Sequence, residues 1–257
     1  MEEYQKPSSA FYGLDQKRQV FDRIVYGNLP YLKEHPGAQL VYESGWKELF
    51  CFTGDDDLRD TLVTGLLISV CFAGLFAFEH RGGMKRVLMA TPLGRKKTVI
   101  AKLLSSGAAA ILLWALVGLP RLIVVLRDYG LPAPFAPAMS LSDYLHLPGW
   151  LPLAGVLALA GLARLAAVLC MAAVTLWLSE VLGSALSAMF LSALVFCLPP
   201  MLALSGLWPL RWVGVYPLFH LAELLRRPGD GAAGLILLGL AAAVCWLCVD
   251  RLRARWE

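Results

Sequence analysis

The sequence predicts an all-α polytopic membrane protein with about five transmembrane helices, and three observations lead to this fold class. Hydrophobic residues make up 58% of the 257 residues, whereas ordinary soluble domains contain about 45–50%. The mean hydropathy is +0.62. The apolar residues also fall into runs that are long enough to cross a hydrocarbon core of about 30 Å at roughly 1.5 Å per helical residue. The predicted spans are 61–78, 103–126, 150–178, 181–204 and 231–249.

The first two spans are defined by their flanking charges. The run 61–78 is uncharged and lies between Asp60 and Glu79. The run 103–126 returns across the membrane, and Pro120-Arg121 predicts a kink and a charge at the outer interface. The following residues, 127–149, are rich in proline, so we expect an external loop with one short interfacial helix at 142–147.

The remaining spans are separated by short polar segments. We expect 150–178 to end in a tight cytoplasmic turn at Ser179-Glu180, and 181–204 to cross outward and break at Pro199-Pro200 near the outer face. Residues 205–230 form an outer segment, in which Trp208, Trp212 and Tyr216 are expected at the membrane interface. The run 231–249 then completes the predicted topology.

The distribution of charge predicts the orientation of these helices. Short loops with an excess of Lys and Arg stay on the cytoplasmic side. The only densely basic segment is 79–102, in which Glu79 is the single acid. Its basic residues are Arg81, Lys85, Arg86, Arg95, Lys96, Lys97 and Lys102. A cytoplasmic loop at 79–102 places the N-terminus outside and the C-terminus, with its basic residues 251–255, in the cytoplasm. Because this topology accounts for the net charge of +4, we expect no binding of nucleic acid.

The expected domains follow from this orientation. Residues 1–58 form an extracytoplasmic polar segment with six basic and ten acidic residues, a net charge of −4. Residues 59–257 form the transmembrane domain, with the cytoplasmic loop at 79–102. No signal peptide is predicted, because Met1 is followed by two acids and no apolar core.

Within the cytoplasmic loop, residues 84–90 are predicted to form a short amphipathic helix. Met84, Val87 and Leu88 follow the spacing i, i+3, i+4 and share one face. Thr91-Pro92 ends this helix, and Gly94 provides a flexible turn before Arg95. On charge alone the loop could be a simple basic connector, which the positive-inside rule favours between any two such spans.

The order of residues in this loop resembles the ABC-2-type transporter permease family. The likeness covers roughly 40–225, and no single motif in it is as specific as a nucleotide-binding signature. The matching residues are Glu79, Gly83-Met84, Leu88, Ala90-Thr91-Pro92, Gly94-Arg95, Ala101-Lys102, Leu198-Pro199-Pro200 and Tyr216-Pro217-Leu218. ABC-2 permeases usually have six spans, and the chain resembles one that lacks the first transmembrane helix.

This resemblance implies the permease subunit of an exporter, with a coupling helix that docks into a groove on a separate ABC ATPase subunit. The expected coupling-loop residues are Glu79, Gly83, Met84, Val87, Leu88, Thr91, Pro92, Gly94, Arg95 and Lys102. The chain has no G-x-x-x-x-G-K-[ST] motif, so ATP is expected to be used by the partner, with no cofactor on this chain. The resemblance further implies a homo- or heterodimer of permease chains in the lipid bilayer of a bacterial plasma membrane.

Arg164 lies near the middle of the predicted span 150–178. A charge at this depth costs roughly 2.5–3.5 kcal/mol on insertion scales, so it should face protein, a partner or water. It is therefore either a structural charge, paired with an acid or with helix-end carbonyls, or a contact in the transport pathway. The four histidines are scattered, and the close pair His220 and Glu223 has no matching pair to complete a metal set, so we expect no metal site and no catalytic residues.

Two other classes of function remain open at this stage. A membrane scaffold or sensor would need no docking helix, and its activity would survive deletion of 84–90. An intramembrane hydrolase would use Ser205 as nucleophile and His220 as base, which would have to lie within hydrogen-bond reach. The sequence contains no third group to orient that base.

Overall fold

The computed structural model describes residues 18, 22, 30, 33, 38, 39, 41, 43–51, 56–80, 83–90, 96–131, 133–205 and 213–256. These residues belong to two compact units. The larger unit comprises Ser44–Leu131 and Gly155–Glu257, and the smaller comprises Pro132–Ala154 with the chain up to Glu43. The described secondary structure is helical apart from one isolated bridge between Pro137 and Pro152.

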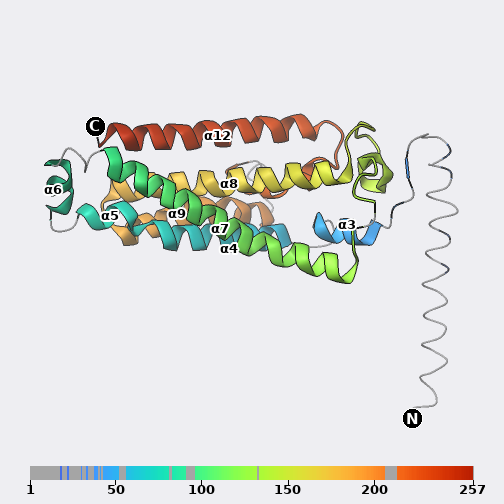
Figure 1. Ribbon diagram of the computed structural model, residues 1–257, viewed down its shortest axis with the longest axis horizontal. Coiled ribbons are helices and arrows are strands. Elements are labelled where there is room, and N and C mark those ends of the chain that lie inside the picture. The colour runs from blue at the N-terminus through green and yellow to red at the C-terminus, as the bar shows by residue number, and fades with distance from the viewer. Residues whose placement is uncertain are drawn as a thin grey trace, which may run out of the picture. The chain divides into compact units, whose positions relative to one another are not determined.

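Within the described ranges, 5 helical segments are long and apolar enough to cross a membrane. This confirms the prediction of an all-α, multi-pass membrane protein. The spanning elements are α4 (Asp56–Phe72) with α5 (Gly74–His80), α7 (Lys96–Asp128), α8 (Leu153–Leu182), α9 (Ala185–Leu204) and α12 (Asp230–Ala254). In Figure 1 these helices run alongside one another, and α4 packs mainly against α9 and also against α7.

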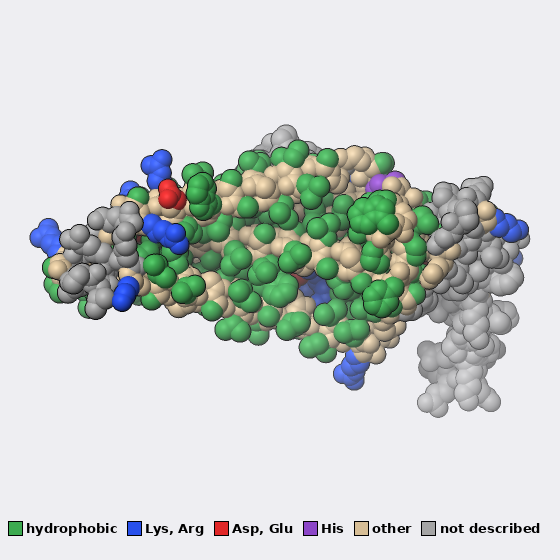
Figure 2. Space-filling view, turned by 45° about the horizontal axis from the view of Figure 1, so that its top comes forward, with side chains coloured by type: hydrophobic (Ala, Val, Ile, Leu, Met, Phe, Trp, Pro, Cys, Tyr) green, Lys and Arg blue, Asp and Glu red, His purple; other side chains and the backbone are tan. Residues whose placement is uncertain are grey.

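The two basic segments lie at the same end of the larger unit. Helix α6 (Met84–Ala90) and the C-terminal end of α12 both lie at the left of Figure 1, whereas α4 begins toward the other end. Figure 2 shows Lys and Arg side chains gathered at the α6 end and apolar side chains along the helices. This arrangement is what the positive-inside rule requires of the predicted orientation.

The first span is interrupted at Ala73, between α4 and α5. A break in a membrane helix leaves backbone groups that lipid cannot satisfy. Ser179 on α8 satisfies them: its hydroxyl donates to the Ala73 carbonyl at 2.6 Å and accepts from the amides of Phe76 at 3.2 Å and Ala77 at 3.0 Å. One side chain on α8 therefore holds both sides of the break.

The predicted turn at Ser179-Glu180 is wrong. Both residues lie inside α8, which continues to Leu182, and the turn is made by Gly183 and Ser184. Gly183 has φ +60°, a left-handed conformation that suits glycine and commonly ends a helix. A polar pair between two apolar runs is typical of a turn, but the partners of Ser179 and Glu180 on other helices allow both residues to stay buried within α8.

The predicted break at Pro199-Pro200 is also wrong, because α9 continues through both prolines to Leu204. Proline is tolerated within membrane helices because neighbouring groups re-satisfy the freed backbone carbonyls. Similarly, α7 continues through Pro120.

Short helices flank the spanning helices. In the larger unit, α10 (Tyr216–Phe219) and α11 (Leu221–Leu224) are buried, and α3 (Glu43–Leu49) carries the fully buried Trp46. In the smaller unit, the helix expected at 142–147 is reduced to the 3-10 turn η4 (Ser142–Tyr144), which follows η3 (Ala138–Ser140). Trp208 and Trp212 lie outside the described residues.

Candidate functional site

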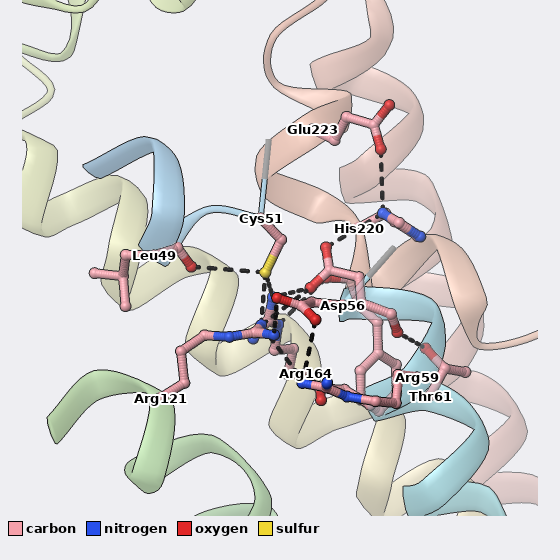
Figure 3. A network of polar contacts seen from close by, with 12 residues as sticks. Leu49, Cys51, Asp56, Arg59, Thr61, Arg121, Arg164, His220 and Glu223 are labelled. Atoms are coloured by element: carbon pink, nitrogen blue, oxygen red, sulfur yellow. Dashed lines mark hydrogen bonds and ion pairs between the residues drawn. The ribbon is translucent and has the colours of Figure 1, made fainter. Parts of the chain in front are cut away.

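A cluster of charged side chains joins four segments of the larger unit, and Figure 3 shows it from close by. We call it the charge cluster. Its members come from α4, α7, α8 and the α10–α11 segment: Asp56, Asp57, Arg59, Asp60, Arg121, Arg164, His220 and Glu223. It brings together acids from the first span and arginines that lie more than 60 residues further along the chain.

Arg164, which the sequence indicated as an intramembrane charge, binds the first turn of α4. Its Nη2 lies 2.5 Å from Oδ1 of Asp57, and its Nε donates to the Phe219 carbonyl at 3.3 Å. Asp57 is fully buried. A buried ion pair offsets its desolvation only with close geometry and further hydrogen bonds, and this pair has both.

Arg121 of α7 binds the same turn of α4 from another side. Its guanidinium lies 3.1 Å from Asp56, 3.1 Å from Asp60 and 3.7 Å from Asp57. These acids stand at the N-terminus of α4, where the helix dipole favours negative charge. The first span therefore begins at Asp56 rather than at the predicted residue 61, because its acids are paired within the protein.

His220 completes the charge balance of the cluster. Among the pairs described, four carboxylates face the three arginines 59, 121 and 164, and a protonated His220 supplies the fourth positive charge. Nδ1 of His220 lies 3.2 Å from Asp57 and 3.1 Å from Glu223. Burial alone would lower the pKa of His220, but the interactions with Asp57 and Glu223 outweigh it and raise this pKa above its ordinary value.

The raised pKa predicts a pH dependence of stability. The native state then holds a proton that the unfolded state releases, so the stabilisation is complete below about pH 6.5 and is lost as pH rises through the raised pKa. We expect His220→Gln to remove this decline in the free energy of unfolding, measured in detergent between pH 5.5 and 9. His146→Gln, at an exposed histidine, is the matched control and should retain it. An unchanged pH profile in His220→Gln would contradict the assignment.

Cys51 adjoins the cluster and lies outside the spans. Burial, followed by the negative charge of Asp57, raises its pKa to about 12. It therefore remains a neutral thiol, whose sulfur accepts a hydrogen bond from Nη1 of Arg121 at 2.6 Å. Such a thiol is a poor nucleophile.

At the other end of the larger unit, the helix predicted at 84–90 is confirmed as α6, with the same bounds. The side chains of Met84 and Val87 are 58% and 67% exposed. Gly83 precedes them with φ +72°, a conformation that glycine adopts at low cost. The helix therefore presents large apolar side chains away from the remainder of the described structure.

The opposite side of α6 is bound to the membrane helices. Nζ of Lys85 forms an ion pair with Oε1 of Glu180, whose side chain is 0% exposed, and lies 5.1 Å from the centre of the Trp256 ring. His80 at the end of α5 lies 3.2 Å from the other oxygen of Glu180. A single buried carboxylate on α8 thus binds residues from both α5 and α6.

Two residues predicted for the coupling loop also meet. Nζ of Lys102 on α7 lies 2.6 Å from Glu79 and donates to the Leu75 carbonyl on α5. It lies 4.6 Å from the centre of the Phe76 ring, which in turn packs edge-on against Trp256 at 5.9 Å. The start and the end of the predicted loop are therefore joined by an ion pair.

Part of the predicted coupling loop lies outside the described residues, and the structure adds other residues to the candidate site. Thr91, Pro92, Gly94 and Arg95 lie outside the described residues. Glu180, Trp256 and Asp57 were not predicted as site residues from the sequence. Glu180 had a visible signal, because it and Arg164 are the only charged residues in the long stretch 150–204. Trp256 had none.

Ser205 and His220, the residues of the alternative hydrolase, each have partners nearby. Ser205 donates its hydroxyl to the Leu202 carbonyl at 2.8 Å, and His220 faces the two carboxylates described above. No protein-family model, curated protein or solved structure matches the chain. Fold and sites together define a helical multi-pass membrane protein with a buried charge cluster at one end and an exposed apolar helix at the other.

Proposed function

We propose that this chain is the permease subunit of an ABC-2-type ATP-binding cassette transporter, and that it exports a substrate with energy from a separate ATPase subunit. The observation that carries the proposal is the two-sided character of α6. One side exposes Met84 and Val87, and the other is held by Lys85 on the buried Glu180. A helix that transmits force needs both an apolar face for its partner and a firm connection to the membrane helices.

The contacts of α8 supply a route for this force. Glu180 binds α6 through Lys85, and one residue earlier Ser179 binds both sides of the break between α4 and α5. A displacement of α6 would therefore move the end of α8 and act on the break at Ala73. Such packed elements shift between discrete arrangements rather than deforming continuously.

The order of matching residues from Glu79 to Lys102 and the concentration of basic residues at this end support the same interpretation. In this proposal α6 faces the cytoplasm of a bacterial cell, and the protein lies in the plasma membrane. The exposed apolar side chains of α7, α9 and α12 face lipid or a second permease chain. A complete transporter would contain two permease chains, identical or different, and two ATPase chains, because one chain with five spans has too few helices to enclose a pathway alone.

Co-purification tests the proposal directly. The tagged chain is expressed together with the proteins encoded beside it and purified in mild detergent. We expect an ABC ATPase to be recovered in about equal amount, and ATP hydrolysis to drive export in proteoliposomes. Recovery of the folded chain without any ATPase would contradict the proposal and favour a scaffold or sensor.

A further inference from the structure

A cavity of about 460 Å³ lies within the larger unit, between α7 and α8. It arises because small residues line both helices. A Cβ atom at Gly118 of α7 would meet nothing within 4 Å, and one at Gly161 of α8 would meet only the Trp114 ring at 3.9 Å. Ala115 and Ala158 widen the space further.

The walls of the cavity are apolar except at one place. The aliphatic and aromatic lining includes Trp114, Leu119, Leu157 and Leu165, and the polar side chains are those of Arg121 and Arg164. These two side chains retain 14% and 17% of their exposure. A molecule that fills this cavity must therefore have an apolar body and a polar group at the end near the two arginines.

The arginines determine which polar group fits. A guanidinium has N–H donors and no acceptor, so the ligand must offer oxygen acceptors. Among the described residues, Nε of Arg121 and Nη1 of Arg164 have no partner, whereas the other nitrogens bind the cluster. With His220 protonated, the four carboxylates and four cations of the described pairs balance one another, so a charged head of either sign would add an uncompensated charge beside the apolar walls. An uncharged head with oxygen acceptors fits best.

The surroundings of the cavity indicate what the apolar part of its ligand is. Because α7 and α8 are both long and apolar enough to span a membrane, an opening between them would face lipid chains. The exposed Leu112 and Leu116 flank it on α7. An apolar cavity of about 150 Å³ binds one benzene molecule, so this volume accommodates a chain of roughly 18 carbons. That is one acyl chain rather than two.

We infer that this cavity is a binding site for a single-chain neutral lipid, with its acyl chain between α7 and α8 and the oxygens of its head accepting hydrogen bonds from Arg121 and Arg164. Monoacylglycerols have this chemistry. The site requires only the folded chain, so it stands independently of the proposed transport function.

Native mass spectrometry of the full chain, released from detergent, tests this inference with monoolein as the probe. We expect one bound monoolein per chain. Oleate and oleylamine, which have the same chain length but charged heads, should bind more weakly, and a two-chain phosphatidylcholine should not compete for the site. Equal binding of monoolein and oleylamine would overturn the assignment of the head group.

Variants that fill the cavity locate the site. Gly161→Leu on α8 and Ala115→Phe on α7 place larger side chains in the cavity from its two sides. Each should weaken monoolein binding about tenfold to a hundredfold, because the cavity becomes overpacked when the lipid is bound. Gly239→Leu is the matched control, because a Cβ at this α12 glycine meets nothing within 4 Å and lies outside the cavity lining. It should bind monoolein normally. Thermal unfolding without ligand identifies a variant that fails to fold, and normal binding by both folded cavity variants would overturn the proposal.

Discussion

Val87→Asp should abolish coupled transport while the membrane helices remain folded. Val87 is 67% exposed on α6, so the substitution costs little within this chain. In the proposed complex it would place an uncompensated charge in an apolar groove of the ATPase. A loss of about 2 kcal/mol at such a position lowers affinity roughly thirtyfold. The same result is expected for Met84→Asp and for the double change of Val87 and Leu88 to Asp.

The controls separate a lost interface from a lost fold. Val87→Leu keeps an apolar side chain and should retain ATPase association and transport. Lys97→Asp changes an exposed basic residue and should mainly affect the orientation of insertion. Association and ATP-driven transport are measured together in proteoliposomes. If Val87→Asp transports normally, α6 is only a charged connector.

Arg164→Met should produce the largest loss of stability in this chain. The substitution removes the cation that lies closest to the buried Asp57. In the native protein Nη2 of Arg164 lies 2.5 Å from Oδ1 of Asp57. Breaking a buried pair in this way costs about 3–5 kcal/mol, because the remaining charge is left poorly compensated. The free energy of unfolding, measured by denaturant titration in mixed micelles, should fall by about this amount.

Arg59→Met is the matched control for this prediction. Arg59 forms an ion pair of 3.1 Å with Asp56 in the same cluster, but its side chain is 68% exposed. Exposed pairs contribute only about 0–1 kcal/mol. Equal losses in the two variants would show that burial of the Asp57 pair does not determine the stability of the cluster.

The fold could be predicted from the sequence to a large extent, because apolar runs report membrane spans directly. The ends of the spans could not. The first span begins at Asp56 because its acids, Asp56 and Asp57, are paired with Arg121 and Arg164, which lie far along the chain. Ser179 and Glu180 looked like a turn because their partners, at Ala73 and on α5 and α6, cannot be seen in the local sequence.

The candidate site was predicted in part. The helix at 84–90 followed from its periodicity and from Thr91-Pro92, and its bounds are confirmed by α6. The side of α6 that binds Glu180 could not be predicted, because Lys85 looked like one more residue of a basic loop. Arg121, Arg164 and the pair His220 and Glu223 were each noted in the sequence, but their meeting in one charge cluster could not be predicted. The three consecutive acids 55–57 are as typical of an exposed segment.

Photo-crosslinking from α6 tests the central proposal most directly. Benzoylphenylalanine is incorporated in place of Val87 or, as control, in place of Leu112, an exposed residue on α7. After irradiation of the complex purified with its neighbouring gene products, we predict a crosslink to the ATPase from position 87 and none from position 112. An ATPase that co-purifies but crosslinks equally from both positions, or from neither, would contradict the assignment of α6 as the coupling helix.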